Sequence, residues 1–207
     1  MKKQKVILFG GSFDPVHKGH LIVAREVFDT LSANALVFIP ARRSPHKEDF
    51  PVSGAHRIEM IRRVIVQNAG FSVSDCELNR PEPSYTLDTI EFFRKSLGPE
   101  AVLHWLIGAD QLADFDKWYK VRDLVDACHV TVMYRAGYPK PSFEGLTGLL
   151  DAGQIAKLEQ HIVKTSLVPI SSTDIRRRIV KGEDLADLID ASVIDYIRSH
   201  QLYGCRG

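Results

Sequence analysis

Residues 10–20 read Gly-Gly-Ser-Phe-Asp-Pro-Val-His-Lys-Gly-His, and this stretch decides the fold of the chain around it. The four apolar residues before it, Val6 to Phe9, are typical of a buried strand. After it, apolar residues recur at helical spacing from Ala24 to Leu31. We therefore predict that the stretch is the strand-to-helix turn of a βα unit.

The turn contains the residue types that bind phosphate. Gly10 and Gly11 lack side chains where a ligand could approach, and the next helix offers its first N–H groups. His17 and His20 are three residues apart, so a helical turn places both imidazoles on one face. The stretch matches neither the dinucleotide fingerprint G-x-G-x-x-G nor the P-loop. A capped helix start with solvated imidazoles would explain one histidine, but not the whole string.

Length and composition limit the fold and the partners. The chain has 207 residues, 44% of them hydrophobic, and a net charge of +1. This is enough for one sizeable core, and the near-neutral charge indicates neither a nucleic-acid nor a membrane partner. No apolar run approaches the roughly 20 residues of a membrane span. Three widely spaced cysteines without metal-site spacing favour reduced thiols in a cytoplasmic protein.

Strand and helix patterns alternate along the rest of the chain. Further strands are predicted at residues 35–40, 71–74, 102–107, 130–134 and 166–169. Before the C-terminal helix, two helices are predicted, one at 155–163 and one from Ser171. The alternation predicts an α/β fold, a Rossmann-like doubly wound and mostly parallel sheet with helices on both faces. Ligands bind such sheets at the carboxyl ends of the strands. The turn at 10–20 and the Gly108–Asp110 segment both fall at that edge.

A second candidate anion site lies near the other end of the chain. Ser171 is predicted to cap a helix, with Asp174 at capping-box distance. Ser172 and Thr173 then occupy the first turn, and Arg176 follows one turn later on the same side. Hydroxyls, N–H groups and a guanidinium together suit phosphate. The ordinary alternative is a well-capped basic surface helix.

These two motifs resemble those of the nucleotidyltransferase superfamily, in which the H-x-G-H pair contacts the phosphates of a nucleoside triphosphate. Within it, the chain resembles the bacterial nicotinate mononucleotide adenylyltransferase family over nearly its whole length. Four further motifs carry this closer resemblance: Pro45-His46-Lys47, Ser84-Tyr85-Thr86, Leu106 to Asp110, and Trp118-Tyr119. The order and spacing of these four point to this family rather than to other members of the superfamily.

The resemblance implies a single nucleotidyltransferase domain over residues 1–207, in which the helices of 170–207 complete the phosphate site. It implies transfer of AMP from ATP to nicotinate mononucleotide, giving nicotinate adenine dinucleotide and pyrophosphate. Mg²⁺ is expected to arrive with ATP, because the sequence shows no dedicated carboxylate cage. Nucleic acid and membrane are not expected partners, the expected location is cytoplasmic, and the oligomeric state is left open.

The site residues that the resemblance implies fall into three groups. Stabilisation of charge at the reacting phosphates is implied for His17, His20, Lys47 and Arg176. Binding of ATP and its phosphates is implied for Gly10, Gly11, Ser12, Phe13, His46, Gly108, Asp110, Ser172 and Thr173. The nicotinate ring and its carboxylate are expected at Thr86, Trp118 and Tyr119, with core packing as the alternative for Trp118. For Asp110, a ribose contact and a helix cap are both compatible, and no metal ligand is predicted.

Other interpretations stay open. A related adenylyl- or cytidylyltransferase with another phosphate acceptor shares the two end motifs, but is not expected to carry the Ser84–Thr86 and Trp118-Tyr119 set. A class I aminoacyl-tRNA synthetase fragment shares the H-x-G-H motif, but the chain has no K-M-S-K-S-like stretch. A non-catalytic nucleotide-binding protein could keep the phosphate contacts without turnover, and pyrophosphate release separates it from an enzyme.

Overall fold

The computed structural model describes residues 3–42 and 51–205. At its centre is a six-stranded sheet in the order β3-β2-β1-β4-β5-β6, and the pairings among the described strands are all parallel. This is the strand order of a doubly wound sheet, so the predicted fold class is confirmed. The strands are β1 (Lys5–Gly11), β2 (Ala35–Pro40), β3 (Phe71–Val73), β4 (Val102–Gly108), β5 (His129–Arg135) and β6 (Ile162–Thr165).

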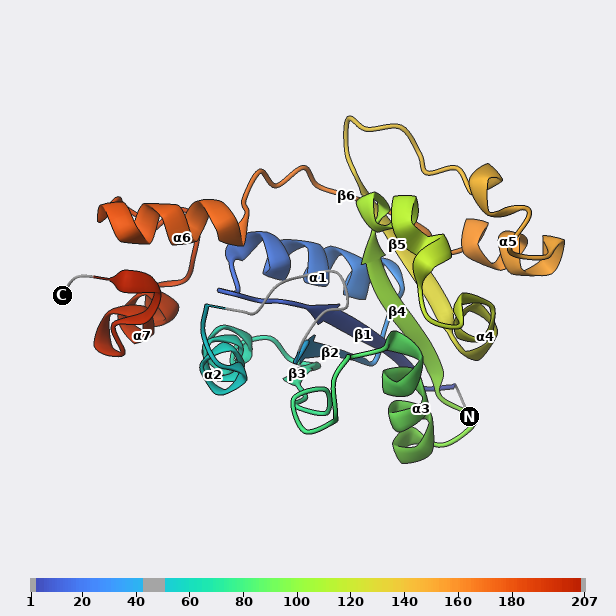
Figure 1. Cartoon of the computed structure of the whole chain (residues 1–207), viewed down its shortest axis with the longest axis horizontal. Coiled ribbons are helices and arrows are strands. Elements are labelled where there is room, and N and C mark those ends of the chain that lie inside the picture. The colour runs from blue at the N-terminus through green and yellow to red at the C-terminus, as the bar shows by residue number, and fades with distance from the viewer. Residues whose placement is uncertain (1–2, 43–50, 206–207) are drawn as a thin grey trace.

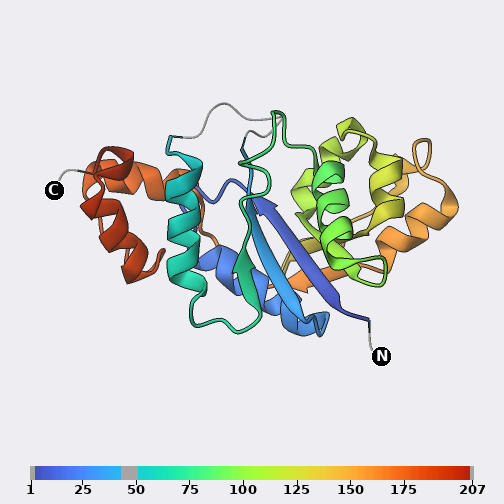
Figure 2. The same cartoon turned by 90° about the horizontal axis from the view of Figure 1, so that it is seen from below.

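Helices cover both faces of the sheet (Figure 1). One face packs against α1 (Lys18–Thr30) and α2 (Gly54–Ile65), and the other against α3 (Thr86–Leu97), α4 (Val121–Ala127) and α5 (Ala152–Glu159). Short 3-10 segments are η1 (Ala109–Lys117) and η2 (Glu144–Leu146). After β6 come α6 (Ser172–Lys181), α7 (Ala191–Ser199) and η3 (Leu202–Gly204). These last elements lie beside α2 at one end of the molecule (Figure 2).

The alternation of side chains along the strands explains the two layers. In β1, Ile7 and Phe9 belong to the core beneath α1 and α2, whereas Val6 and Leu8 belong to the core beneath α3 and α4. All four are buried, so the strand is covered on both faces. Continuous apolar runs of this kind are typical of parallel sheets. No helix in the described part of the chain is long and apolar enough to cross a lipid bilayer.

The carboxyl ends of β1 and β4 meet at the topological switch point of the sheet. These strands are neighbours, yet the chain leaves β1 toward β2 and leaves β4 toward β5, on opposite sides. Diverging connections of this kind leave a crevice between the strand ends, where ligands bind. The turn at 10–20 follows β1, and Gly108 ends β4. The fold therefore places the first motif at the ligand-binding edge.

The prediction of a sixth strand at 166–169 is wrong, and the helix predicted over 155–163 exists but begins and ends earlier. α5 ends at Glu159, and β6 is Ile162–Thr165, paired in parallel with β5. Val163 and Thr165 are buried, whereas Leu167 is 50% exposed, so the strand lies four residues before the predicted one. The apolar pair Leu167-Val168 has the sequence pattern of a strand but lies outside the sheet, near the surface.

Candidate active site

His17 and His20 cap the start of α1 together. The His17 Nδ1 accepts a hydrogen bond from the His20 N–H at 3.3 Å, and the His20 Nδ1 accepts one from the His17 N–H at 3.2 Å. The two rings stack with centroids 3.6 Å apart. Because each Nδ1 accepts, the neutral form of each ring carries its proton on Nε2. The Nε2 atom of each neutral ring is therefore a hydrogen-bond donor.

Burial keeps His17 neutral at physiological pH. The residue is 7% exposed, and desolvation lowers its pKa from 6.5 to about 4. At physiological pH His17 is thus a hydrogen-bond donor rather than a cation. An anionic phosphate bound beside it would favour the protonated ring and raise this pKa.

The glycines of the turn make room for side chains of the protein itself. A Cβ on Gly10 would lie 2.4 Å from Cζ2 of Trp105, and one on Gly11 would lie 2.8 Å from Cζ of Phe13. The space that we expected a ligand to use beside these two glycines is therefore occupied. A Cβ on Gly19 would lie 3.0 Å from the His17 Nδ1, so this glycine allows the imidazole to close over the helix start.

Phe13 supports the histidine pair from the core. Its ring lies 5.0 Å from that of His20 and 5.4 Å from those of Phe9 and Phe38. Its φ of 48° lies in the left-handed region and turns the chain sharply after β1. The side chain is buried, so a ligand contact at Phe13 is restricted to the backbone.

The start of α6 lies against the turn. Ser172 Oγ donates to the Pro15 carbonyl oxygen at 2.9 Å, and Arg176 Nη1 donates to the Asp14 carbonyl oxygen at 2.7 Å, across 157 and 162 positions of sequence. Arg176 Nη2 also donates to Thr173 Oγ1 at 3.3 Å. The two motifs that the sequence suggested as separate anion sites therefore form one surface.

The cap of α6 matches its sequence signal in part. Ser171 accepts a hydrogen bond from the Asp174 N–H at 3.1 Å, as predicted. The Asp174 carboxylate pairs instead with the side chains of Arg177 and Arg178. This pairing occupies the two neighbouring arginines on the outer surface, while Arg176 faces the turn.

Gly108 and Asp110 lie across the switch point from the turn. Asp110 is exposed in the first turn of η1. A Cβ added to Gly108 would lie 2.3 Å from Oδ1 of Asp110, so the carboxylate folds back over the end of β4. An exposed carboxylate in this position is accessible to a ribose hydroxyl.

Thr86, Trp118 and Tyr119 lie around the start of α3. The ring of Tyr119 stacks on that of Tyr85 with centroids 4.3 Å apart, and the half-buried Trp118 ring lies 5.2 Å from Phe115. Tyr85 is the N-cap residue of α3 and makes no side-chain cap, and Thr86 is the first helical residue. A planar aromatic acid would meet both ring surfaces and helix N–H groups here.

A buried polar network holds this helix start. Thr89 Oγ1 donates to Glu77 Oε1 at 2.7 Å, and Arg80 Nη2 donates to the Tyr85 carbonyl oxygen at 3.1 Å and to Thr89 Oγ1 at 3.0 Å. Burial raises the pKa of Glu77, while the Thr89 hydrogen bond and the Arg80 charge oppose that rise. Sequence reasoning missed this network and gave Tyr85 no role. The position of Tyr85 beside Thr86 in the motif was the available signal.

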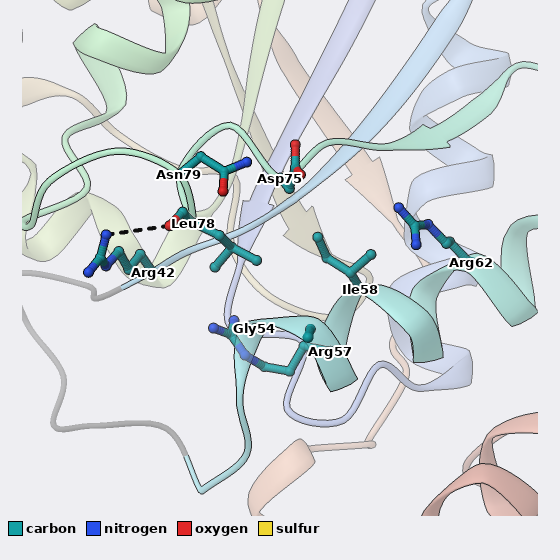
Figure 3. A pocket seen from close by; sticks show the side chains of 9 residues that line it. Arg42, Gly54, Arg57, Ile58, Arg62, Asp75, Leu78 and Asn79 are labelled. Carbon is teal, nitrogen blue, oxygen red and sulfur yellow. Dashed lines mark hydrogen bonds between the residues drawn. The ribbon is translucent and has the colours of Figure 1, made fainter.

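His46 and Lys47 belong to residues 43–50 and lie outside the described residues. A pocket of about 580 Å³ lies at the start of α2 and is lined by residues such as Arg42, Arg57 and Asp75 (Figure 3). Arg57 connects it to the turn, because its guanidinium donates to the Ser12 and Ala41 carbonyl oxygens, each at 2.8 Å. Among the residues that the structure describes, none of the predicted site residues lines this pocket.

Comparisons with known proteins identify the family of the chain. Residues 8–178 match the Cytidylyltransferase-like family model. A probable nicotinate-nucleotide adenylyltransferase from Carboxydothermus hydrogenoformans is 38% identical, over 98% of this chain and 100% of its own. Another from Rhodopirellula baltica is 36% identical, over 96% of this chain and 93% of its own.

Solved structures share the fold. The Plasmodium falciparum nicotinic acid mononucleotide adenylyltransferase complexed with NaAD has a TM-score of 0.74 at 21% identity and covers 98% of both chains. The same enzyme complexed with APC has a TM-score of 0.73. With the matches above, the chain belongs to the Cytidylyltransferase-like family and, within it, to the nicotinate-nucleotide adenylyltransferases.

Proposed function

We propose that this enzyme transfers the adenylyl group of ATP to the phosphate of nicotinate mononucleotide and releases pyrophosphate. The observation that carries the proposal is the joining of the turn at 10–20 to α6 through Ser172 and Arg176. This joined surface lies at the switch point of the sheet, and the helix start at Thr86 supplies an acceptor site beside aromatic rings. The names of the relatives support the same acceptor.

The reaction needs positioning and charge neutralisation more than proton transfer. An oxygen of the acceptor phosphate forms a bond to the α-phosphorus, and the bond from that phosphorus to the oxygen bridging to the β-phosphate breaks. A phosphate monoester is largely ionised at pH 7, so no general base is required. Negative charge builds on the α-phosphate oxygens and on the departing pyrophosphate. Fixed donors around those oxygens lower the barrier.

We assign these donors to the joined surface. The Nε2–H groups of His17 and His20 point away from their cap and would contact the phosphates. Arg176 has further N–H groups beyond those bonded to Asp14 and Thr173, and a guanidinium holds two phosphate oxygens at once. Lys47 is proposed to add a further positive charge. Asp110 is placed to accept a hydrogen bond from a ribose hydroxyl.

The acceptor site favours a carboxylate over an amide. The first N–H groups of α3, the Thr86 hydroxyl and the N–H groups near Tyr119 are all donors. The carboxylate of nicotinate accepts from all of them, whereas the NH₂ of nicotinamide would face donors without a partner. An unpaired buried polar group costs about 1–3 kcal/mol, which corresponds to selectivity of roughly tenfold to a hundredfold.

We propose that Mg²⁺ enters bound to ATP. The donors on the joined surface are N–H groups, which suit anions. Within residues 3–42 and 51–205, no group of three His, Cys, Asp or Glu side chains could hold a metal ion. Phosphate oxygens and water would therefore supply most of its ligands. ATP as a substrate also favours the cytoplasmic location that the sequence suggested.

The test is pyrophosphate release by the purified chain with Mg–ATP and either nicotinate or nicotinamide mononucleotide. We expect kcat/KM to be at least tenfold higher with nicotinate mononucleotide, and the dinucleotide to appear in step with pyrophosphate. Equal values would refute the assigned acceptor chemistry. ATP binding without pyrophosphate release from either acceptor would favour the non-catalytic alternative, and release with another phosphate acceptor alone would favour a related transferase.

A further inference from the structure

The 3-10 segment η3 reaches back to the turn that follows β1. Tyr203, in η3, donates its hydroxyl to Oδ1 of Asp14 at 2.6 Å, across 189 positions of sequence. The part of the chain after α6, which we call the C-terminal unit, makes two more hydrogen bonds to the turn. The Leu188 carbonyl oxygen accepts from the Lys18 N–H at 2.9 Å, and the Ala186 carbonyl oxygen accepts from Lys18 Nζ at 2.7 Å. The Tyr203 hydrogen bond is therefore one of several that join the C-terminal unit to the turn.

Asp14 acts inside the protein rather than on a ligand. The residue is 1% exposed, and burial raises the pKa of its carboxyl group, while the Tyr203 hydrogen bond and the Arg176 and Arg57 charges oppose that rise. Among the described residues, its second oxygen, Oδ2, is buried without a hydrogen-bond partner. The Tyr203 hydroxyl is therefore the bond that fixes the orientation of this side chain.

The backbone of Asp14 connects this bond to the reacting groups. Its carbonyl oxygen accepts from Arg176, and Ser12, two residues earlier, accepts from Arg57. Three residues later the chain reaches His17 and its stack with His20. A shift of Asp14 would therefore move Arg176 and the histidine pair relative to each other.

We propose that Tyr203 is a positioning residue for adenylyl transfer: by holding Asp14, it fixes the turn at 10–20 against Arg176. The inference rests on the proposed function and assigns a role in it to the C-terminal 3-10 segment. Displacement of reacting groups by about 1 Å can cost on the order of a hundredfold in rate, so loss of one tether is expected to lower kcat.

The chain offers a matched control. Tyr196, on α7 in the same C-terminal unit, makes a hydrogen bond of 2.9 Å between its hydroxyl and His56 Nδ1, on α2. Tyr196→Phe and Tyr203→Phe each remove one hydroxyl and keep the aromatic ring. Only Tyr203→Phe removes a bond to the turn.

The experiment measures kcat and both KM values, the Kd for Mg–ATP by calorimetry, and amide hydrogen exchange over residues 10–20. We expect Tyr203→Phe to lower kcat about tenfold, with the KM for nicotinate mononucleotide within twofold, and to speed exchange in the turn. Tyr196→Phe is expected to leave kcat and turn exchange within twofold of wild type. Wild-type kinetics and exchange for Tyr203→Phe, or equal losses in both variants, would overturn the proposal.

Two further comparisons distinguish failure of the proposed function from failure of the variant to fold. If the wild-type chain shows no adenylyl transfer, the proposed function fails, and the exchange and ATP-binding comparison still tests whether Tyr203 orders the turn. If Tyr203→Phe does not fold, Asp14→Asn is the second variant, because Asn keeps an oxygen that accepts from Tyr203. It is expected to keep slow exchange in the turn; fast exchange would contradict an anchoring role for this bond.

Discussion

Two groups of stacked histidines lie at opposite edges of the sheet. At the carboxyl edge, His17 and His20 stack with ring centroids 3.6 Å apart. At the amino edge, His129 and His161 stack at 4.2 Å, and the ring of His104 lies 5.0 Å from that of His129. Both groups are held by strands and helix ends of the same sheet, so their surroundings can be compared directly.

Burial lowers the pKa of His17 in one group and of His104 and His129 in the other, so a shifted pKa does not distinguish the groups. Desolvation lowers the pKa of His17 to about 4, that of His129 to about 4 and that of His104 to about 3. What differs is the position in the fold. The carboxyl-edge pair caps the N-terminus of α1, next to the turn whose Asp14 carbonyl oxygen accepts from Arg176.

In the amino-edge group His104 is buried, whereas His129 and His161 are half-buried. His104 Nδ1 hydrogen-bonds Thr131 Oγ1 at 2.9 Å, and His161 Nδ1 hydrogen-bonds the Lys157 carbonyl oxygen at 2.7 Å. We propose that these rings only pack, and that a histidine in this fold takes part in the reaction only at the carboxyl edge of the sheet.

The largest expected effect separates the two groups by mutation. His20→Ala should lower kcat by about 10²–10³, or about 2.7–4 kcal/mol, because it removes a donor where charge develops in the transition state. His161→Ala, at the other edge, should leave kcat within twofold. Steady-state kinetics of the two purified variants make the comparison. A His20→Ala enzyme within threefold of wild type would remove the functional difference that we draw between the edges.

A smaller effect is expected from Arg176→Lys. The charge is kept, but an ammonium group cannot hold Asp14, Thr173 and two phosphate oxygens in a fixed fork. We expect kcat/KM for ATP to fall about tenfold. Arg177→Lys, one residue further along α6 and paired on the surface with Asp174, is the control and should change little. Unchanged kinetics for Arg176→Lys would reduce this residue to a structural contact.

The smallest effect concerns stability at low pH. His104 is 2% exposed, and the charged groups that shift the pKa values of His104 and His129 are other histidines and the cations Lys5, Lys157 and Arg94. Folding therefore keeps these rings neutral. Above about pH 6.5 they are neutral in both states and contribute no pH dependence. As the pH falls from 6.5 toward 4, the unfolded chain binds protons that the folded chain refuses, and stability falls.

His104→Gln tests this explanation. For each histidine whose pKa is lowered by folding, the free energy of unfolding should fall by about 1.4 kcal/mol per unit of decreasing pH between pH 6.5 and 4. The variant removes one group, and its stability should therefore depend less steeply on pH than that of wild type. Urea unfolding at several values between pH 7 and 4.5 gives both slopes, and identical slopes would show that His104 is not kept neutral by folding.

The sequence was most informative where chemistry is concentrated in short strings. The turn at 10–20 and the Ser171 cap contain their own local geometry, so their positions and their sheet edge could be predicted. Residues 162–169 were misassigned because two short apolar runs compete there, and only burial against α1 and β5 decides between them.

Contacts between distant residues were not predictable from the sequence. Tyr203, Arg57 and Glu77 belong to no motif, and their partners are a carboxylate, backbone carbonyl oxygens and a hydroxyl brought close only by the fold. The histidines at the amino edge likewise become neighbours through strand register, which places His104 opposite His129.

The most direct test of the central claim is a crystal structure of the protein with nicotinate adenine dinucleotide, the proposed product. We expect the diphosphate to lie against the Nε2 atoms of His17 and His20 and beside Arg176, and the pyridine carboxylate to meet the N–H groups at Thr86. A dinucleotide bound in the pocket beside α2, with no contact to the histidine pair, would contradict the account.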